Sequence, residues 1–95
     1  MQSIVTEYRK NCIFCGRPTD EEHHLLFGTA SRRLAEEDGL KVPCCEHCHT
    51  QNETCRRVHG NPMAEKFSKM LGQAIYEAKI GTREEFRRRY GVSYF

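Results

Sequence analysis

Two pairs of cysteines in this 95-residue chain have the spacing of zinc knuckles. Two residues separate Cys12 from Cys15, and two separate Cys45 from Cys48. Four thiolates at this spacing supply the closed tetrahedral coordination of a structural zinc ion, and Gly16 permits the sharp turn that wraps the first pair around the metal. A closed site leaves no open coordination position. We therefore expect the zinc to hold the fold together while other residues carry the chemistry.

The two remaining cysteines are less suited to metal binding. Cys44 is an alternative to Cys45, but two intervening residues close a knuckle better than three, which favours Cys44 as a small buried residue. Cys55 has no partner at ligand spacing. Six cysteines in a short chain can also form disulfides, but no apolar run suggests a secretion signal or a membrane span. We expect a protein of the reducing cytoplasm, with zinc favoured over disulfides and no membrane partner.

Three histidines near the knuckles are candidates for a second site. His23 and His24 lie between the knuckles, and His49 directly follows the last cysteine. Adjacent strand residues point to opposite faces, so His23 and His24 are expected to have different roles. These histidines could converge on a partly open metal site, which suits metal-assisted hydrolysis of a phosphate ester with a neutral histidine as the base. The simpler interpretation is that they only hydrogen-bond the backbone. His47 is interpreted as an exposed spacer.

The elements that position these residues are short. The first 11 residues form either a short strand or a docked arm. The pattern further predicts strands at His23–Phe27 and Leu40–Pro43, and a short helix whose first turn holds Cys48 and His49. Between the strands it predicts a helix at Ser31–Asp38 that Ser31 caps. The inward residues of this helix are expected to be Leu34 and Ala35, and the outward ones Arg32, Arg33, Glu36 and Glu37.

Two further helices are expected after Gly60. Asn61 and Pro62 provide the start of a long helix that Gly81 closes, and Thr82 opens a last short helix with a capping box. The tail from Val92 is expected to pack back on the core. The predicted buried faces are Phe67, Met70, Leu71, Ala74, Ile75 and Ala78 in the long helix and Phe86 and Tyr90 in the short one.

The charge distribution is uneven along the chain. From Arg56 onward there are nine Lys or Arg against four Glu, whereas residues 1–55 have six against nine Asp or Glu. The basic half is either a solvated helical surface or a face that contacts phosphates. The candidates for phosphate contacts are Arg56, Arg57, Arg87, Arg88 and Arg89.

The run His23–Gly28, together with Gly39–His49, resembles small phage-type HNH endonucleases, also called His-Me finger nucleases, in their zinc-stapled form. The similarity continues through Val58–Asn61, the helix that follows, and the closing Tyr90–Phe95. The double histidine and the Cys-x-x-Cys-His ending are its specific part. The resemblance implies one α+β domain: a zinc-stapled ββα-metal, treble-clef-like core at about residues 11–60, and C-terminal helices at about 61–95.

The same resemblance implies cleavage of DNA with one divalent cation, Mg²⁺ or Mn²⁺. By position, His23 becomes a ligand of that ion, His24 the general base, His49 a second ligand and His59 a candidate third. For His59, a hydrogen bond to a nearby loop is an equal alternative. The products would carry 5′-phosphate and 3′-hydroxyl ends.

The family's middle Asn is missing from its usual place before the second strand. That Asn braces the loop that orients the base, and Asp38 or Asn61 could replace it. The alternative function is a zinc-stapled module that binds DNA or a protein without catalysis. No base-reading element is evident, so sequence specificity is expected to be weak. A second copy of the chain and phage packaging or recombination proteins are open as partners.

Overall fold

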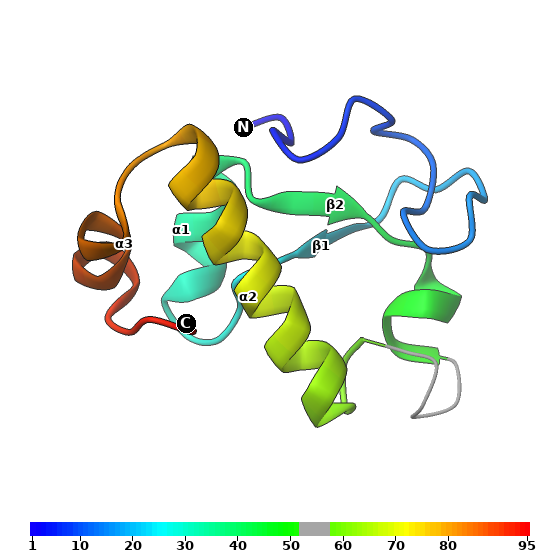
Figure 1. Cartoon of the computed structure of the whole chain (residues 1–95). Coiled ribbons are helices and arrows are strands. Elements are labelled where there is room, and N and C mark those ends of the chain that lie inside the picture. Colours follow the sequence, from blue (N-terminus) through cyan, green and yellow to red (C-terminus); the bar gives the residue numbers. More distant parts are fainter. Residues whose placement is uncertain (52–57) are drawn as a thin grey trace.

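A computed structural model describes residues 1–51 and 58–95 of the chain. A two-stranded antiparallel sheet lies near its middle, with α2 running across the molecule, α3 at one end and η1 at the other (Figure 1). The fold is thus a small α+β arrangement. In chain order the elements are β1 (Glu22–His24), α1 (Ser31–Asp38), β2 (Lys41–Pro43), the π-helical turn η1 (His47–Gln51), α2 (Pro62–Lys79) and α3 (Arg83–Tyr90).

The strands β1 and β2 form the frame beside which the cysteines and histidines gather. His23 pairs with Val42, and His24 pairs with Lys41. The predicted first strand was too long: β1 ends at His24, and Leu25 and Leu26, which follow it, are both buried in the core. The second strand starts one residue later than predicted, although Leu25 N still donates to Leu40 O at 2.9 Å.

Helix α1 has the predicted bounds, but its N-cap is not the predicted residue. Ala30 occupies the N-cap position without a side-chain cap, so Ser31 is the first helical residue and the expected Ser31 cap is wrong. Gly39 ends the helix at φ 72°, where a Cβ would lie 2.6 Å from the carbonyl oxygen of Gln2. A side chain at Gly39 would therefore push away the N-terminal arm as well as strain the turn.

The first residues form a docked arm, one of the two expected alternatives. Ser3 is buried and its Oγ donates to Lys41 O at 2.5 Å, while Ile4 N donates to Gly39 O at 3.0 Å. Lys79 Nζ donates to Ile4 O at 2.7 Å from the end of α2. The arm thereby connects the end of α1, β2 and α2.

Helix α2 starts as predicted but buries a different face. Asn61 Oδ1 accepts from the N–H groups of Met63 and Ala64. The predicted stripe was wrong for three of its six members, since Phe67 is 68% exposed and Ala74 and Ala78 are also exposed. Leu71 and Ile75 are partly buried and pack against the core, as predicted. The buried face lies one position further along and consists of Ser68, Gly72, Gln73 and Tyr76.

Gly72 explains this rotation of the buried face. A Cβ at this position would lie 2.2 Å from Leu26 Cδ2 and 3.1 Å from Leu25 Cβ. The helix therefore approaches the β1 end so closely that only glycine fits. The hydrophobic pattern of the sequence does not reveal this, because glycine adds nothing to an apolar stripe. The helix also ends at Lys79, with Ile80 rather than Gly81 as its C-cap.

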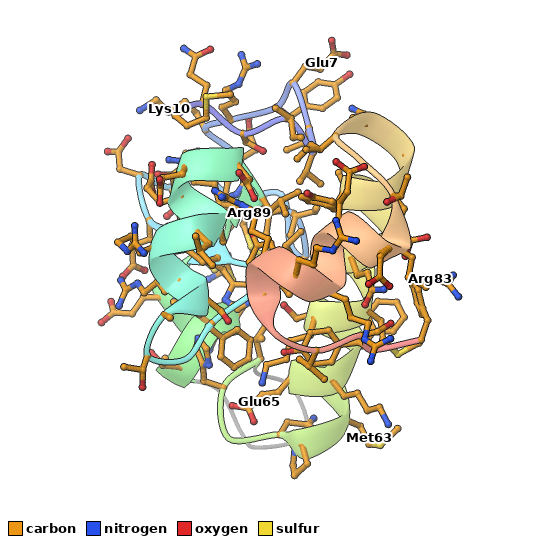
Figure 2. All side chains as sticks on the ribbon, turned by 90° about the vertical axis from the view of Figure 1, so that its left-hand side faces the viewer. Glu7, Lys10, Met63, Glu65, Arg83 and Arg89 are labelled. Carbon is orange, nitrogen blue, oxygen red and sulfur yellow. The ribbon has the colours of Figure 1, made fainter. Side chains whose placement is uncertain are left out.

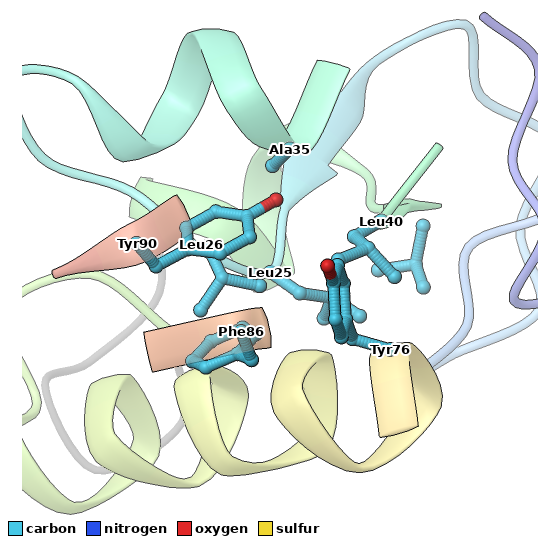
Figure 3. Close-up of a cluster of buried hydrophobic side chains, with 8 residues drawn as sticks. Leu25, Leu26, Ala35, Leu40, Tyr76, Phe86 and Tyr90 are labelled. Atoms are coloured by element: carbon cyan, nitrogen blue, oxygen red, sulfur yellow. The ribbon is translucent and has the colours of Figure 1, made fainter. Parts of the chain in front are cut away.

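Helix α3 completes the core and closes it against α1. The Thr82–Glu85 capping box is present, and Phe86 and Tyr90 are buried as predicted. Figure 3 shows Tyr76, Phe86 and Tyr90 around Leu26 and Leu40, with Ala35 of α1 above them. Stacked and edge-on ring contacts join Phe86 to Tyr90 at 4.5 Å and to Tyr76 at 5.3 Å.

The C-terminal tail packs back only in part. Tyr94 contacts the core, and its N–H donates to Gln73 Oε1 at 2.6 Å. Phe95 and Val92 remain 50% and 46% exposed, so the expectation that both terminal rings are covered was wrong for Phe95. Within the described residues, no helix has the length and apolarity needed to cross a membrane.

Candidate metal centres

The four knuckle cysteines come together as predicted. The sulfur atoms of Cys12, Cys15, Cys45 and Cys48 all lie within 4.8 Å of one another. The Cys15 and Cys45 sulfurs are 3.6 Å apart. A zinc tetrahedron with bonds of about 2.3 Å has sulfur–sulfur edges of about 3.8 Å, so this group fits a zinc ion.

Backbone hydrogen bonds hold the two knuckles against the sheet. Gly16 adopts φ 78° and its N–H donates to Cys12 O at 2.9 Å, which closes the first turn. Ile13 N donates to Pro43 O at 2.9 Å and so connects this turn to the end of β2. Because Cys45 follows two residues later, the sheet fixes the distance between the knuckles.

The thiols of this region differ in acidity. Burial opposes ionisation of Cys12, but backbone N–H donors from Cys45, Cys15 and Phe14 outweigh it and lower the Cys12 pKa to about 6. Burial, followed by the nearby charges of Cys12 and Cys45, raises the pKa of Cys44 to about 12. Cys44 is fully buried and outside the ligand group, which confirms it as a small core residue.

The other cysteine and histidine predictions can be placed as follows. The described cysteines are all free, so no disulfide forms among residues 1–51 and 58–95. Cys55 lies outside the described residues. His47 is exposed, as expected of a spacer, and belongs to neither ligand group.

A second ligand group contains three histidines. Nitrogens of His23, His49 and His59 all lie within 4.8 Å of one another. His23 Nδ1 and His49 Nε2 are 3.2 Å apart, within the roughly 3.0 to 3.4 Å that separates two nitrogens bound to one ion at about 2.1 Å. The structure thus brings together the three residues that the family resemblance implied as ligands.

Each of these histidines comes from a different element. His23 lies in β1 and His49 in η1, directly after Cys48. His59 is held beside them by the backbone, since Val58 N donates to Cys48 O at 3.1 Å and His59 N donates to His49 O at 3.2 Å. The second knuckle therefore positions two of the three imidazoles.

Ser68 controls the protonation of His23. The Ser68 hydroxyl donates to Leu25 O at 2.9 Å, so it can only accept from His23 Nε2, which lies 2.8 Å away. His23 Nε2 must then carry the hydrogen, and Nδ1 presents its lone pair toward His49. Burial, with the neighbouring His49 and His59, lowers the His23 pKa to about 3 and keeps this ring neutral. Sequence reasoning missed Ser68, whose signal was a polar residue one turn before Gly72.

His24 is separate from the three-histidine group but close to it. Its Nε2 lies 2.8 Å from Glu36 Oε1, and its side chain is 13% exposed. A charge on His24 contributes to lowering the pKa of His49, after burial and the charges of His59 and Arg32. Glu36 was predicted to point outward, and its side chain is indeed 44% exposed, but the sequence did not reveal that it contacts both His24 and Lys41.

The two residues expected to replace the missing Asn have other partners. Asp38 accepts from Arg89 at 2.8 and 2.9 Å and from the Tyr90 hydroxyl at 2.8 Å, which fastens α1 to α3. Asn61 caps α2. Asp38 and Asn61 are thus engaged elsewhere, whereas His24 Nε2 faces Glu36 Oε1.

The three predicted phosphate contacts that the structure describes, Arg87, Arg88 and Arg89, lie on α3 and not beside the histidines. Arg56 and Arg57 lie outside the described residues. Arg89 is committed to Asp38, and Arg87 and Arg88 face Glu84 at 4.0 and 3.8 Å. Figure 2 views the molecule from the α3 side, where Arg83 and Arg89 are labelled, and Figure 1 shows that η1 lies at the opposite end.

Two cations that sequence reasoning left out lie nearer. The charge of Arg32, from the first turn of α1, contributes to lowering the His49 pKa after burial and His59. Lys69 Nζ lies 4.6 Å from the Phe27 ring, whose centre is 4.7 Å from that of His59. Both side chains are therefore neighbours of the three-histidine group.

An apolar groove of about 900 Å³ runs between the first knuckle and the start of α2. His23 and Cys48 contribute to its lining. Three large side chains along it are strongly exposed: Phe14 at 62%, Met63 at 76% and Phe67 at 68%.

The described residues form a small α+β protein, and among them two groups could each hold a metal ion. The chain matches no protein-family model, no curated protein and no solved structure.

Proposed function

We propose that this chain is a metal-dependent DNA endonuclease or nickase of the HNH type, with a separate structural zinc. The carrying observation is the arrangement of four histidines. Three of them converge on one point, and the fourth, His24, is held apart by a carboxylate. Metal-assisted hydrolysis of a phosphodiester uses both parts, a cation site and a base that does not bind the cation.

The two ligand groups suit two different ions. Four cysteines fill a zinc tetrahedron and leave no site for substrate. His23, His49 and His59 supply three nitrogens, which leaves positions for phosphate oxygen and water. Imidazoles favour transition metals over Mg²⁺, so Mn²⁺ fits this group better than Mg²⁺. A divalent cation held by these three histidines would stabilise charge on the scissile phosphate and on the leaving 3′ oxygen.

The protein's own groups supply the remaining chemistry. Glu36 accepts the Nε2 hydrogen of His24, which leaves Nδ1 of His24 free to take a proton from water. Attack of this water on phosphorus and departure of the 3′ oxygen give 5′-phosphate and 3′-hydroxyl ends. Arg32 and Lys69 are the nearby cations for contacts to flanking phosphates. This arrangement of base and ligands supports a ββα-metal core.

The apolar groove favours one alternative, a zinc-stapled binding module. Phe14, Met63 and Phe67 are exposed around a hollow large enough for a partner side chain or helix. In that case the three histidines would hydrogen-bond one another, with His49 Nε2–H donating to His23 Nδ1 over 3.2 Å. Such a module would bind without cleaving.

Supercoiled plasmid separates the two functions. Zinc-loaded protein is incubated with plasmid and Mn²⁺, Mg²⁺, Ni²⁺ or Zn²⁺, and nicked and linear products are quantified. We expect nicking that requires added metal, is lost in His24→Ala and is retained in His47→Ala, whose exposed ring belongs to neither ligand group. Folded protein that keeps one zinc per chain but nicks with none of these metals would contradict the nuclease and favour the binding module.

A further inference from the structure

We propose that Glu36 is the positioning residue that holds His24 in its basic tautomer, in place of the asparagine that the sequence lacks. This inference rests on the proposed function for its catalytic meaning. The contact itself does not: His24 Nε2 and Glu36 Oε1 are 2.8 Å apart.

The chemistry of the pair determines where the hydrogen of His24 lies. An ionised carboxylate can only accept, so the imidazole nitrogen facing it must carry the hydrogen. His24 Nε2 is that nitrogen, and Nδ1 is left with its lone pair. A carboxylate that orients a histidine base in this way fixes both the ring position and the tautomer.

The fold holds Glu36 in place through its other oxygen. Oε2 accepts from Lys41 Nζ at 2.9 Å and from the N-terminal ammonium at 3.2 Å. Lys41 is buried, pairs with His24 across the sheet, and also contacts Glu22 Oε1 at 3.1 Å. Two ammonium groups thus donate to one oxygen of Glu36, and His24 contacts the other oxygen. Hydrogen bonds from Lys41 and then His24 lower the Glu36 pKa to about 2, so the acceptor stays ionised.

The three consecutive carboxylates of α1 show that this contact is selective. Glu37 pairs with Arg33 on the surface at 3.0 Å, and Asp38 binds Arg89 and the Tyr90 hydroxyl. Of these three carboxylates, Glu36 is the one that contacts a histidine. Glu37 is therefore a matched control: it is the adjacent acidic residue on the same helix and has no such contact.

The first test reads the tautomer directly and needs no cleavage. Long-range ¹H–¹⁵N spectra of ¹⁵N-labelled, zinc-loaded protein distinguish the protonated from the bare nitrogen of each imidazole. We expect His24 to be protonated at Nε2 in the wild type and in Glu37→Gln, and to become a mixture of tautomers in Glu36→Ala. An unchanged His24 tautomer in Glu36→Ala would overturn the inference.

The second test separates positioning from binding. We expect Glu36→Ala to lower kcat for plasmid nicking about 10- to 100-fold, the range for partners that orient a functional histidine, with KM for DNA and affinity for Mn²⁺ unchanged. Glu36→Gln keeps one acceptor oxygen and a similar volume, so its loss should be smaller, and it covers the case in which the Ala variant folds poorly.

The outcomes separate the two proposals. Unchanged kcat in both Glu36 variants, or an equal loss in Glu37→Gln, would contradict the role of Glu36. If the wild type nicks nothing with any metal, the proposed nuclease fails, and the tautomer spectra still decide whether Glu36 orients His24.

Discussion

The four-cysteine group and the three-histidine group are neighbours built on different principles. The cysteines come from two local turns, each with its ligands three positions apart. The histidines come from β1, from η1 and from the short segment of residues 58–61 that precedes α2. The first group is complete on its own, whereas the second has open positions and depends on a serine of α2 for the orientation of His23. A group of local turns suits a structural ion, and a group assembled from distant segments suits a site where substrate must enter.

The position of the histidine group depends on the cysteine group, whereas the cysteine group does not depend on the histidines. Cys48 and His49 are adjacent in η1, and the backbone of this turn positions Val58 and His59. Loss of zinc should therefore move the three histidines away from one another, whereas loss of a histidine should leave the four sulfur atoms in place. This asymmetry ranks the expected effects of mutation.

The largest effect is expected at the cysteines. Cys12→Ser or Cys45→Ser should unfold the domain, because structural zinc binding contributes about 10 to 16 kcal/mol in small zinc domains and is inseparable from folding. Circular dichroism and zinc content, expected at one ion per chain, measure this. Cys44→Ala, which removes a buried sulfur outside the ligand group, should keep its zinc. A wild-type chain that stays fully folded in strong chelator would contradict the prediction.

The next effect is on catalysis alone. His24→Ala should lower the nicking rate about 10²- to 10⁴-fold, the usual contribution of a general base, with zinc content, Mn²⁺ affinity and DNA affinity retained. Single-turnover nicking and metal titration measure the two separately. Equal loss of Mn²⁺ binding in His24→Ala and His23→Ala would make both residues ligands and leave the water without a base.

The sequence predicted the ligands better than it predicted the elements around them. Ligand spacing is a local property, so the knuckles and the caps at Asn61 and Thr82 could be read from neighbouring residues. The bounds of α1 were right, but its N-cap was placed one residue too late, at Ser31 instead of Ala30. Such errors are small and follow from alternatives that are close in energy.

The larger errors arose where tertiary contacts decide. The buried face of α2 follows from the close approach at Gly72, and Ser68 is buried because His23 needs a partner. Glu36 contacts both Lys41 and His24 because these two residues pair across the sheet. None of these contacts joins residues near in sequence in a way that periodicity could reveal.

Loss of a histidine ligand should affect metal binding more than structure. His23→Ala and His49→Ala should weaken binding of Mn²⁺, so that raised Mn²⁺ partly restores nicking, while zinc content stays at one ion per chain. Ser68→Ala should weaken Mn²⁺ binding about 10- to 100-fold, as for other partners that orient a ligating histidine. Titration of Mn²⁺ by electron paramagnetic resonance measures this. A loss of zinc in His23→Ala would show that the two groups are coupled in both directions.

Acid should weaken the fold partly through His23. Its pKa falls from 6.5 to about 3 on folding, chiefly through burial. Between these values the unfolded chain binds a proton that the folded chain does not, so the stability that His23 contributes is full above about pH 6.5 and is lost as the pH falls toward 3. The free energy of unfolding of zinc-loaded protein, measured with urea at pH 7, 6 and 5, should fall more steeply with decreasing pH for the wild type than for His23→Gln. The same change in the free energy of unfolding with pH for both proteins would mean that His23 is protonated equally in the folded and unfolded states.

The smallest effect is expected at the cations beside the histidine group. Arg32 and Arg33 are adjacent in α1, but the charge of Arg32 affects His49, whereas Arg33 pairs with Glu37 at 3.0 Å. If Arg32 contacts a phosphate, Arg32→Ala should weaken DNA binding several-fold and reduce the slope of log affinity against log salt concentration by about 1. Arg33→Ala, with the same change in charge, should alter the slope less. Fluorescence anisotropy between 50 and 200 mM salt measures both. Equal slopes for the two variants would show that DNA senses only the overall charge of α1, and would remove Arg32 from the site while leaving the four histidines in place.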